Sequence, residues 1–203
     1  GLQAARTLGY LHERGVLHRD VNANNVIIEL GRTPRVTLID LGCASLTPEF
    51  YTHASRRYLT PPEARVTIPD GGIETLDWSA PEARAGQGWT GKSDVYSLGL
   101  LLYRLLTGKL PTVLGDDEPT PVERYAPGCP ADIAGVVLDM LQARPGDRPT
   151  AAEVEEAFAD IREEMIAVIE GGAAEPRQAE PVAAIPVFTP MGSSPALASL
   201  SAA

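Results

Sequence analysis

The segment that most constrains the fold of this 203-residue chain is SDVYSLGLLLYRLLT, at residues 93–107. When it is coiled at 3.6 residues per turn, apolar side chains occupy nearly every side, so no face is suited to water. It is also short and contains Arg104, whereas a bilayer span needs about 20 apolar residues. The segment therefore predicts a helix buried at the centre of a domain, with Ser93 or Asp94 near its N-cap and Gly108 after its end.

Two other segments have an apolar pattern typical of one helical face. Residues 1–14 carry apolar side chains at helical spacing, and Gly15 follows as the expected C-cap. Residues 130–143 begin with Pro130, a residue common at the start of helices. Five residues form the apolar face expected for this second helix: Ile133, Val136, Val137, Met140 and Leu141.

A last helix is predicted to begin after Thr150, its expected N-cap. Glu153 stands three residues later and completes a capping box, and Gly171 ends the pattern. Residues 171–203 are rich in Pro and Ala and poor in charge, which predicts a disordered tail or flexible linker. The sequence thus divides into a domain at 1–170 and a tail.

Two short β-like runs flank a turn sequence and predict a small hairpin. They are VII at 26–28 and VTLI at 36–39, joined through ELGRTP. Residues 43–91 have no dominant period, and such long irregular segments are usually functional or disordered. The expected fold class is therefore mainly α, with one short β hairpin.

The charge and cysteine content exclude some partners. A net charge of -10 opposes binding to a phosphate backbone, so we expect no nucleic-acid partner. Cys43 and Cys129 make no disulfide framework, which favours a reducing, cytoplasmic compartment. The first residue is glycine within a helical pattern, so we expect a piece excised from a longer chain. That parent chain could be membrane-tethered, but this segment itself predicts no membrane contact.

Three polar residues end the short strands and turns. Asp20 precedes Asn25 by five residues, and Asp40 follows the second β-like run. The hairpin can bring Asn25 and Asp40 to one edge, where an amide oxygen and a carboxylate suit Mg²⁺, with Mn²⁺ as an alternative. Asp20 could then orient or deprotonate a hydroxyl beside a metal-bound phosphate. These parts suit phosphoryl transfer, in which positioning and electrostatics supply most of the catalysis.

Five motifs resemble those of eukaryotic-type protein kinases, in the family's order. HRDVNANN at 18–25 resembles the catalytic loop H-R-D-x-x-x-x-N, and DLG at 40–42 resembles the D-F-G metal motif. The other three are SAPEA at 79–83, the buried helix at 93–107, and RPGDRPTAAEV at 144–154. The bacterial Ser/Thr kinases are the most similar branch. The resemblance implies a kinase C-terminal lobe at 1–170 that transfers the ATP γ-phosphoryl group to Ser or Thr of a protein substrate.

The resemblance also implies site roles. Asp20 would be the catalytic base, or the group that orients the substrate hydroxyl. Asn25 and Asp40 would hold Mg²⁺ and, through it, ATP. Val26 and Ile27 would form the floor under adenine.

The family's structural roles fall on four more residues near the catalytic loop. Arg19 would await a phosphate on the activation segment, and His18 and Leu41 would join an apolar regulatory stack. Asp94 would cap the backbone of the catalytic loop. His12 and His53 are interpreted as ordinary surface groups.

Two further inferences remain open at this stage. Glu82 would pair with Arg148 and tie the activation segment to the lower helices, although both could be simple surface charges. Cys43 follows the D-L-G motif and could face the nucleotide cleft.

Asn22 departs from the family pattern. Ser/Thr kinases usually have Lys two residues after the catalytic Asp, where it neutralises charge on the transferring group. Asn can donate a hydrogen bond but supplies no charge. Donors aimed at developing charge are each worth about 2.7–4 kcal/mol, so losing a full charge could slow transfer. Some related bacterial kinases have Ser or Thr there, so the change does not itself imply inactivity.

The activation segment has two candidate ends, at Pro62-Glu63 and at Pro81-Glu82. The second leaves the usual short spacing to Asp94 and puts Thr75 where such kinases have the threonine that reaches back to the catalytic loop. Residues 52–72 then form an insertion. It contains candidate phosphosites and two arginines that could pair with a phosphate: Thr52, Ser55, Thr60, Arg56 and Arg57.

The family's N-terminal lobe has no counterpart in this sequence, which contains neither a Gly-rich loop nor a V-A-I-K-type lysine. The missing lobe is therefore an expected partner, and we expect the fragment alone to be inactive. An alternative is a pseudokinase or docking module that binds a partner without chemistry. A small-molecule kinase of the aminoglycoside or choline type is a third reading, which the A-P-E and D-R-P features oppose.

Overall fold

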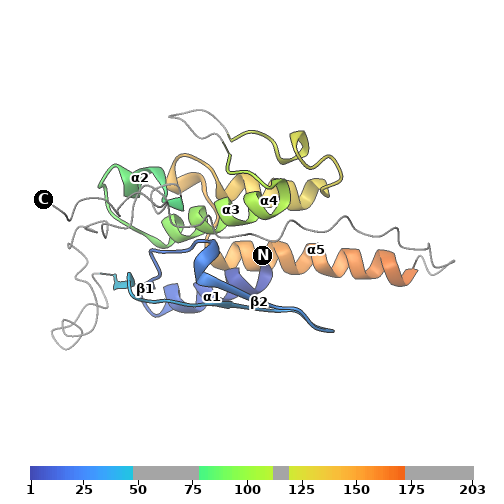
Figure 1. Cartoon of the computed structure of the whole chain (residues 1–203), viewed down its shortest axis with the longest axis horizontal. Coiled ribbons are helices and arrows are strands. Elements are labelled where there is room, and N and C mark those ends of the chain that lie inside the picture. The colour runs from blue at the N-terminus through green and yellow to red at the C-terminus, as the bar shows by residue number, and fades with distance from the viewer. Residues whose placement is uncertain (48–77, 112–118, 172–203) are drawn as a thin grey trace, which may run out of the picture.

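The computed structural model describes residues 1–47, 78–111 and 119–171, and this part is built around four longer helices (Figure 1). These are α1 (Leu2–Glu13), α3 (Gly91–Thr107), α4 (Ala131–Met140) and α5 (Ala151–Gly171). One short helix and three 3₁₀ turns connect them: α2 (Pro81–Arg84), η1 (Ala23–Asn25), η4 (Val122–Arg124) and η5 (Pro145–Asp147). The expected mainly α architecture is confirmed. The tail was predicted for 171–203, of which Gly171 is the last residue of α5 and 172–203 lie outside the described residues.

Helix α3 is the buried centre of the fold, as its all-round apolar sequence predicts. Its side chains join both apolar clusters, one shared with α1 and the other with α4. Gly99 permits the close approach of α4, because a Cβ there would lie 2.9 Å from the Cβ of Met140. Gly108 ends the helix with φ 72, the left-handed conformation expected of a C-cap glycine.

The prediction that Ser93 or Asp94 lies near the N-cap of α3 is confirmed, because both residues are in the first turn of the helix. Thr90 is the N-cap, and Ser93 is the third helical residue, whose Oγ accepts a hydrogen bond from the Thr90 amide at 3.1 Å. Asp94 is fully buried and faces the catalytic loop instead of the helix terminus. Ser93 therefore takes part in capping as the residue that completes a capping box with Thr90.

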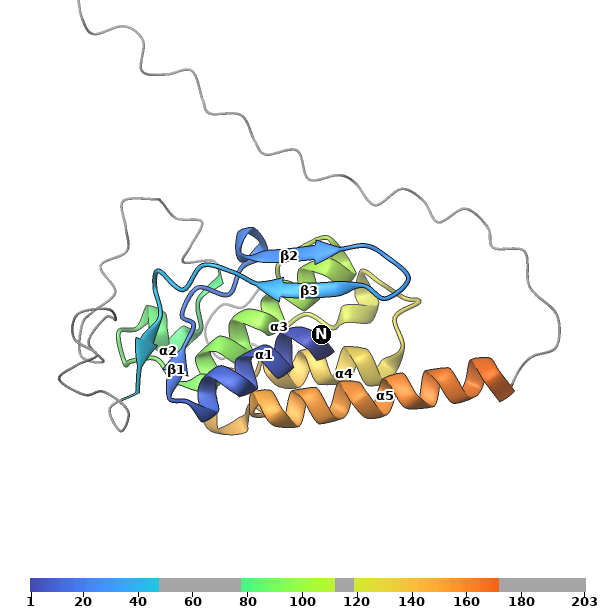
Figure 2. The ribbon, with the colours of Figure 1, turned by 90° about the horizontal axis from the view of Figure 1, so that it is seen from below.

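Two antiparallel strand pairs lie beside the helices (Figure 2). The predicted hairpin is confirmed as β2 (Val26–Glu29) paired with β3 (Arg35–Leu38), in the register Val26 opposite Leu38. A second pair joins β1 (Val16–Leu17) to β4 (Ser45–Leu46), which the sequence did not predict. These two pairs frame the catalytic-loop motif between them.

The side chain of Gln3 connects helix α1 to the hairpin through two hydrogen bonds. Gln3 donates from Nε2 to the carbonyl of Pro34 at 2.8 Å, and its Oε1 accepts from the amide of Val36 at 2.8 Å. Both groups of the amide are therefore used on β3 and the turn before it. The hairpin, and with it the candidate site, has a fixed position on α1.

Helices α1 and α5 run side by side in opposite directions (Figure 2). Arg6 pairs with Glu155 at 2.6 Å, and Gly1 lies against the ring of Phe158. The predicted capping box of α5 is confirmed, because the Glu153 amide donates to Thr150 Oγ1 at 3.2 Å and Glu153 Oε2 accepts from the Thr150 amide at 2.6 Å. Among the helices of the described ranges, none combines the length and apolarity that crossing a bilayer requires.

Candidate functional site

The carboxylate of Asp20 is held by two side-chain amides. Asn22 donates from Nδ2 to Asp20 Oδ1 at 2.7 Å, and Asn25 donates from Nδ2 to Asp20 Oδ2 at 2.7 Å. Asn25 also donates to the carbonyl of Asp20 at 2.9 Å. Because the NH₂ group of Asn25 is directed at Asp20, its Oδ1 is the atom oriented away from that carboxylate. The loop therefore fixes Asp20 with neutral donors, which do not cancel its charge.

Asn22 has a second role in the turn that follows. Its Oδ1 accepts from the amide of Asn24 at 2.8 Å, so it is the side-chain N-cap of η1. The residue is only 7% exposed. A side chain that must both accept from Asn24 and donate to Asp20 has to carry an acceptor and a donor, and lysine has no acceptor. Local geometry thus accounts for Asn at this position.

The end of the hairpin brings Asp40 beside the catalytic loop. The amide of Ile39 donates to the carbonyl of Asn25 at 2.9 Å, one residue before Asp40. Asp40 has φ 64, and its Oδ1 accepts from the amide of Gly42 at 2.8 Å. A Cβ on Gly42 would lie 2.9 Å from that oxygen, so a side chain there would displace the Asp40 carboxylate. The D-L-G sequence is therefore a tight turn that presents an exposed carboxylate.

The thiol of Cys43 is close enough to both carboxylates to be affected by their charge. Burial raises the pKa of Cys43, the charges of Asp20 and Asp40 raise it further, and Arg19 opposes them. Asp20 and Asp40 therefore both lie within electrostatic reach of the Cys43 thiol. A thiol with a raised pKa is protonated near neutral pH and is not an activated nucleophile.

The donor set at this edge fits a hard divalent cation. It offers the amide oxygen of Asn25 and the carboxylate of Asp40, with Asp20 close by. Across the described ranges, no three His, Cys, Asp or Glu residues converge as a self-sufficient metal cage. A site with few protein ligands suits Mg²⁺, which keeps waters and takes phosphate oxygens. The assignment of Asn25 and Asp40 as ligands remains a prediction.

Asp94 anchors the start of the catalytic loop from α3, and the predicted contact is confirmed. Its Oδ2 accepts from the amide of His18 at 2.9 Å, and its Oδ1 accepts from the amide of Arg19 at 2.8 Å. Arg19 has φ 67, a left-handed conformation that is uncommon outside glycine. The carboxylate thus holds the loop in a strained shape one residue before Asp20.

The interpretation of His12 as an ordinary surface group is wrong. Its Nε2 lies 2.9 Å from Asp94 Oδ2, and its side chain is mostly buried. A signal was present in the sequence, since Ala5, Leu8 and His12 fall on one side of a helix at spacings of three and four. The first two are core residues, so the third faces the same interior.

Arg19 and His18 are buried with little polar compensation. Burial lowers the pKa of Arg19, and its guanidinium lies 5.8 Å from the ring centroid of Trp89. Within the described ranges, Arg19 Nε and both ring nitrogens of His18 have no hydrogen-bond partner.

His18 is fully buried whereas Leu41 is exposed, so the structure does not bury the expected stack of these two side chains. Thr75 and the candidate phosphosites lie outside the described residues.

The hairpin presents part of the expected adenine floor. Val26 is half-buried and packs against the α1–α3 core, while Ile27 is 48% exposed next to it on β2. Ile27 therefore offers exposed apolar surface on β2, two residues after Asn25. Its contact with adenine remains a prediction.

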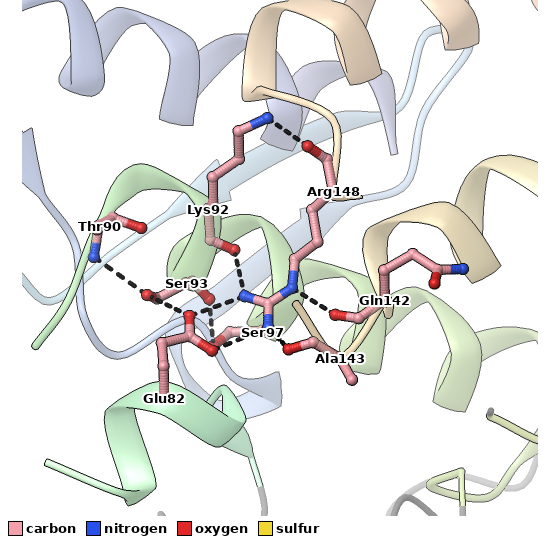
Figure 3. A network of polar contacts seen from close by, with 8 residues as sticks. All are labelled: Glu82, Thr90, Lys92, Ser93, Ser97, Gln142, Ala143 and Arg148. Carbon is pink, nitrogen blue, oxygen red and sulfur yellow. Dashed lines mark hydrogen bonds and ion pairs between the residues drawn. The ribbon is translucent and has the colours of Figure 1, made fainter. Parts of the chain in front are cut away.

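Glu82 and Arg148 form a buried, bidentate ion pair, not two surface charges (Figure 3). Arg148 donates from Nη1 to Glu82 Oε1 and from Nη2 to Glu82 Oε2, each at 2.8 Å. Ser93 adds a bond from Oγ to Glu82 Oε1 at 2.7 Å. Burial raises the pKa of Glu82, but the hydrogen bonds from Arg148 and Ser93 outweigh it, so the net pKa is lowered.

Every nitrogen of Arg148 has a partner. Besides Glu82, it donates to three carbonyls, those of Gln142, Ala143 and Lys92, at 2.6, 2.9 and 3.1 Å. Its guanidinium also lies 4.6 Å from the ring centroid of Tyr96. The pair therefore joins α2 to α3 and to the segment before α5, as the motif position implied. The choice of Pro81-Glu82 as the end of the activation segment agrees with this contact.

The comparison with known families agrees with these motifs. Residues 2–158 match the model of the protein kinase domain. The chain belongs to the protein kinase family. It is 31% identical over 164 residues to the serine/threonine-protein kinase PknJ of Mycobacterium tuberculosis, covering 74% of this chain and 26% of the relative.

Two further relatives carry similar names. PknB of M. tuberculosis is 32% identical over 163 residues, covering 74% of this chain and 24% of the relative. A probable serine/threonine-protein kinase of Dictyostelium discoideum is 29% identical over 175 residues, covering 81% and 26%. The chain spans about a quarter of the length of these relatives.

Proposed function

We propose that this chain is the C-terminal lobe of a protein serine/threonine kinase, which transfers the γ-phosphoryl group of ATP to a Ser or Thr hydroxyl of a protein substrate. One observation carries the proposal: two amides fix the Asp20 carboxylate without neutralising it. Beside it, the carbonyl of Asn25 accepts from the amide of Ile39, one residue before Asp40, which supports a shared role of Asn25 and Asp40 at this edge. The printed names of the relatives support the same activity.

In this proposal Asp20 accepts a hydrogen bond from the substrate hydroxyl and directs its oxygen at the γ-phosphorus. The new O–P bond forms as the bond to ADP breaks, and the hydroxyl proton passes to Asp20. Mg²⁺ or Mn²⁺, held by Asn25 and Asp40, would spread the negative charge of the phosphates. Oδ1 of the exposed Asp40 carboxylate accepts from the Gly42 amide, so Oδ2 is the oxygen that would bind the metal.

Asn22 would act mainly by positioning Asp20. A neutral amide provides less stabilisation of charge on the phosphoryl group than lysine, so we expect a weaker enzyme than relatives that carry lysine there. The structural reason for keeping Asn is its bond to the Asn24 amide. Thr75 would join Asp20 as a contact to the substrate side of the loop.

The proposed partners are a protein substrate and a kinase N-terminal lobe supplied in the same polypeptide. Exposed Ile27 and Leu41 give the hairpin edge an apolar surface for that lobe and for adenine. We propose a cytoplasmic location, with no nucleic-acid or membrane contact through this segment. The acidic net charge of -10 supports the first exclusion.

The decisive experiment joins the N-terminal lobe of mycobacterial PknB to residue 1 and assays ATP-dependent labelling of a generic protein substrate. We expect labelling by this fusion, none by residues 1–203 alone, and none by the Asp20→Asn fusion. Labelling that survives Asp20→Asn would contradict the assigned role. Strong labelling by residues 1–203 alone would contradict the need for the lobe.

A docking module without catalysis is the second candidate, and the neutral Asn22 favours it. It predicts an inactive fusion that still folds and binds a partner protein. Introducing the family lysine by Asn22→Lys then separates the readings. Activity that appears only with the lysine would favour the docking module, and activity in both fusions would favour the kinase.

A further inference from the structure

Two cations lie on one exposed tyrosine ring just beyond the C-terminal end of α3. Lys109 Nζ is 4.3 Å from the centroid of the Tyr125 ring, and the guanidinium carbon of Arg124 is 6.0 Å from the same centroid. Both cationic side chains are exposed, and Tyr125 is 39% exposed. We call Lys109, Arg124 and Tyr125 the basic cluster.

Two turns tied to the helices hold the basic cluster in place. The amide of Lys109 donates to Thr107 Oγ1 at 3.1 Å, in the turn that ends α3. The amide of Tyr125 donates to the carbonyl of Val122 at 3.1 Å, and Val122 is fully buried in the apolar cluster that α3 shares with α4. The charges are therefore presented by a fixed backbone, which lowers the entropic cost of binding a partner.

The two charges of the basic cluster have no counter-charge in the described part of the chain. No carboxylate there forms an ion pair with Lys109 or Arg124, not even Glu123, although the net charge of the chain is -10. Because both cations lie on one ring, they are at most about 10 Å apart, close to one Debye length at physiological ionic strength. They therefore repel each other, and a carboxylate bound between them relieves this repulsion.

The basic cluster lies within reach of a peptide bound at the catalytic loop. Asp94 accepts from the amide of Arg19, one residue before Asp20, and α3 continues from Asp94 to Thr107, about 20 Å along its axis at 1.5 Å per residue. An extended peptide advances about 3.3 Å per residue, so about six residues cover this distance. A substrate with its hydroxyl at Asp20 therefore has the length to place a more distant side chain on the cluster.

We propose that the basic cluster is a docking site for an acidic segment of the protein substrate, in which Asp or Glu side chains pair with Lys109 and Arg124. A carboxylate segment fits better than a nucleic-acid backbone, because the net charge of -10 opposes a long polyanion. The docking itself stands on the contacts above. Its effect on phosphorylation rests on the proposed kinase function.

Binding of a fluorescent oligoglutamate peptide to residues 1–203, followed by anisotropy, tests the docking site directly. The double variant Lys109→Gln with Arg124→Gln should weaken binding about tenfold, the scale of two exposed ion pairs, and the wild-type affinity should fall as salt is added. The matched control removes two other exposed cations, by Arg144→Gln with Arg162→Gln, and should change the affinity little. Equal weakening in both double variants, or no binding by the wild type, would overturn the proposal.

The acidic residues of the chain at 116–118 are an alternative occupant, and they lie outside the described residues. The test neutralises them together, by Asp116→Asn, Asp117→Asn and Glu118→Gln. Its control changes three exposed acids of α5 to Gln: Glu156, Glu163 and Glu164. The two variants should bind oligoglutamate equally. Tighter binding by the first alone would assign the basic cluster to the chain itself, and stronger binding of a short DNA duplex than of oligoglutamate would assign it to nucleic acid. Either result overturns the proposal.

The kinetic test uses the fusion with the PknB N-terminal lobe and two peptide substrates, which carry Glu or Gln about six residues to both sides of the acceptor Ser. Lys109→Gln with Arg124→Gln should raise the KM for the Glu peptide about tenfold, while kcat and the KM for the Gln peptide stay unchanged. Equal KM values for the two peptides in the wild-type fusion would overturn the proposal.

Two further results have a defined meaning. If urea denaturation shows that the double variant does not fold, Lys109→Gln alone decides, with an expected loss of affinity of about threefold. An unchanged affinity in that variant would then reject the docking site. An inactive wild-type fusion would count against the kinase function alone, because anisotropy still tests the docking site on residues 1–203.

Discussion

Two carboxylates of this protein have opposite environments, and the contrast separates stability from chemistry. Glu82 faces the guanidinium of Arg148 in a bidentate pair inside the fold. Asp20, at a partly open edge, accepts side-chain hydrogen bonds from the neutral amides of Asn22 and Asn25, and no ion pair to it is found among the described residues. The charge of Glu82 is cancelled within the protein, whereas the charge of Asp20 has neutral partners among the described residues and, in the proposed function, serves the substrate hydroxyl.

The difference follows from what each position must do. A buried charge without a partner is very costly, so Glu82 requires Arg148. A carboxylate that accepts a proton or orients a hydroxyl needs a fixed orientation and an unpaired negative charge. Neutral amide donors fix the orientation without pairing the charge. The comparison predicts that substitutions at the two places will change different measurements.

The largest expected effect is loss of activity at Asp20. In the fusion with the PknB N-terminal lobe, Asp20→Asn should lower the rate of phosphoryl transfer by about 10²–10⁴-fold, the usual contribution of a general base. The free energy of unfolding should change little, because the described part of the chain holds no ion pair to Asp20 that the substitution would break. Chemical denaturation of the same samples checks this, and a large loss of stability would break the comparison.

The next effect is loss of stability at Arg148. Arg148→Met leaves Glu82 buried without its cation and should lower the free energy of unfolding by about 3–5 kcal/mol. Urea denaturation of residues 1–203 measures it. Arg6→Gln is the matched control, since its pair with Glu155 is exposed and should be worth about 0–1 kcal/mol. If Arg148→Met and Arg6→Gln lowered the free energy of unfolding by similar amounts, the buried pair would contribute no more than the exposed one.

The pH dependence of stability should isolate Glu82. Because the fold lowers the pKa of Glu82, its pair contributes stability that is fully present above the ordinary value of 4.5 and is lost as the pH falls through the lower, folded value. The difference in unfolding free energy between wild type and Glu82→Gln should therefore shrink below pH 4.5. Urea titrations at several pH values test this. If the difference in unfolding free energy increased toward acidic pH, the fold would raise the pKa of Glu82 instead of lowering it.

The sequence predicts the parts of this fold that are local or that a motif carries. The central helix follows from its all-round apolar pattern, and the β2–β3 hairpin follows from two short runs about a turn. The β1–β4 pair was missed because two residues on each side give no periodicity and the partners are about 30 positions apart. Contacts between such distant short segments depend on the packing of everything else.

The same limit applies to the candidate site. The positions of Asp20, Asn25 and Asp40 follow from a loop and a hairpin that are close in sequence. The contact of His12 with Asp94 spans 82 positions and depends on how α1 packs against α3. Helical spacing could indicate that His12 faces inward, but the group that it meets there required the structure.

The smallest effect tests whether the neutral environment of Asp20 limits the enzyme. Asn22→Lys adds a cation next to Asp20 but removes the acceptor for the Asn24 amide. We expect stability to fall by about 1 kcal/mol, as for loss of an N-cap, while kcat of the fusion rises several-fold. Asn22→Ser is the matched control, because it keeps a capping oxygen without a charge and should leave kcat at or below the wild-type value. A fall in kcat with lysine would mean that holding Asp20 in place matters more here than added charge, since the amide donor to Oδ1 is lost in the same substitution.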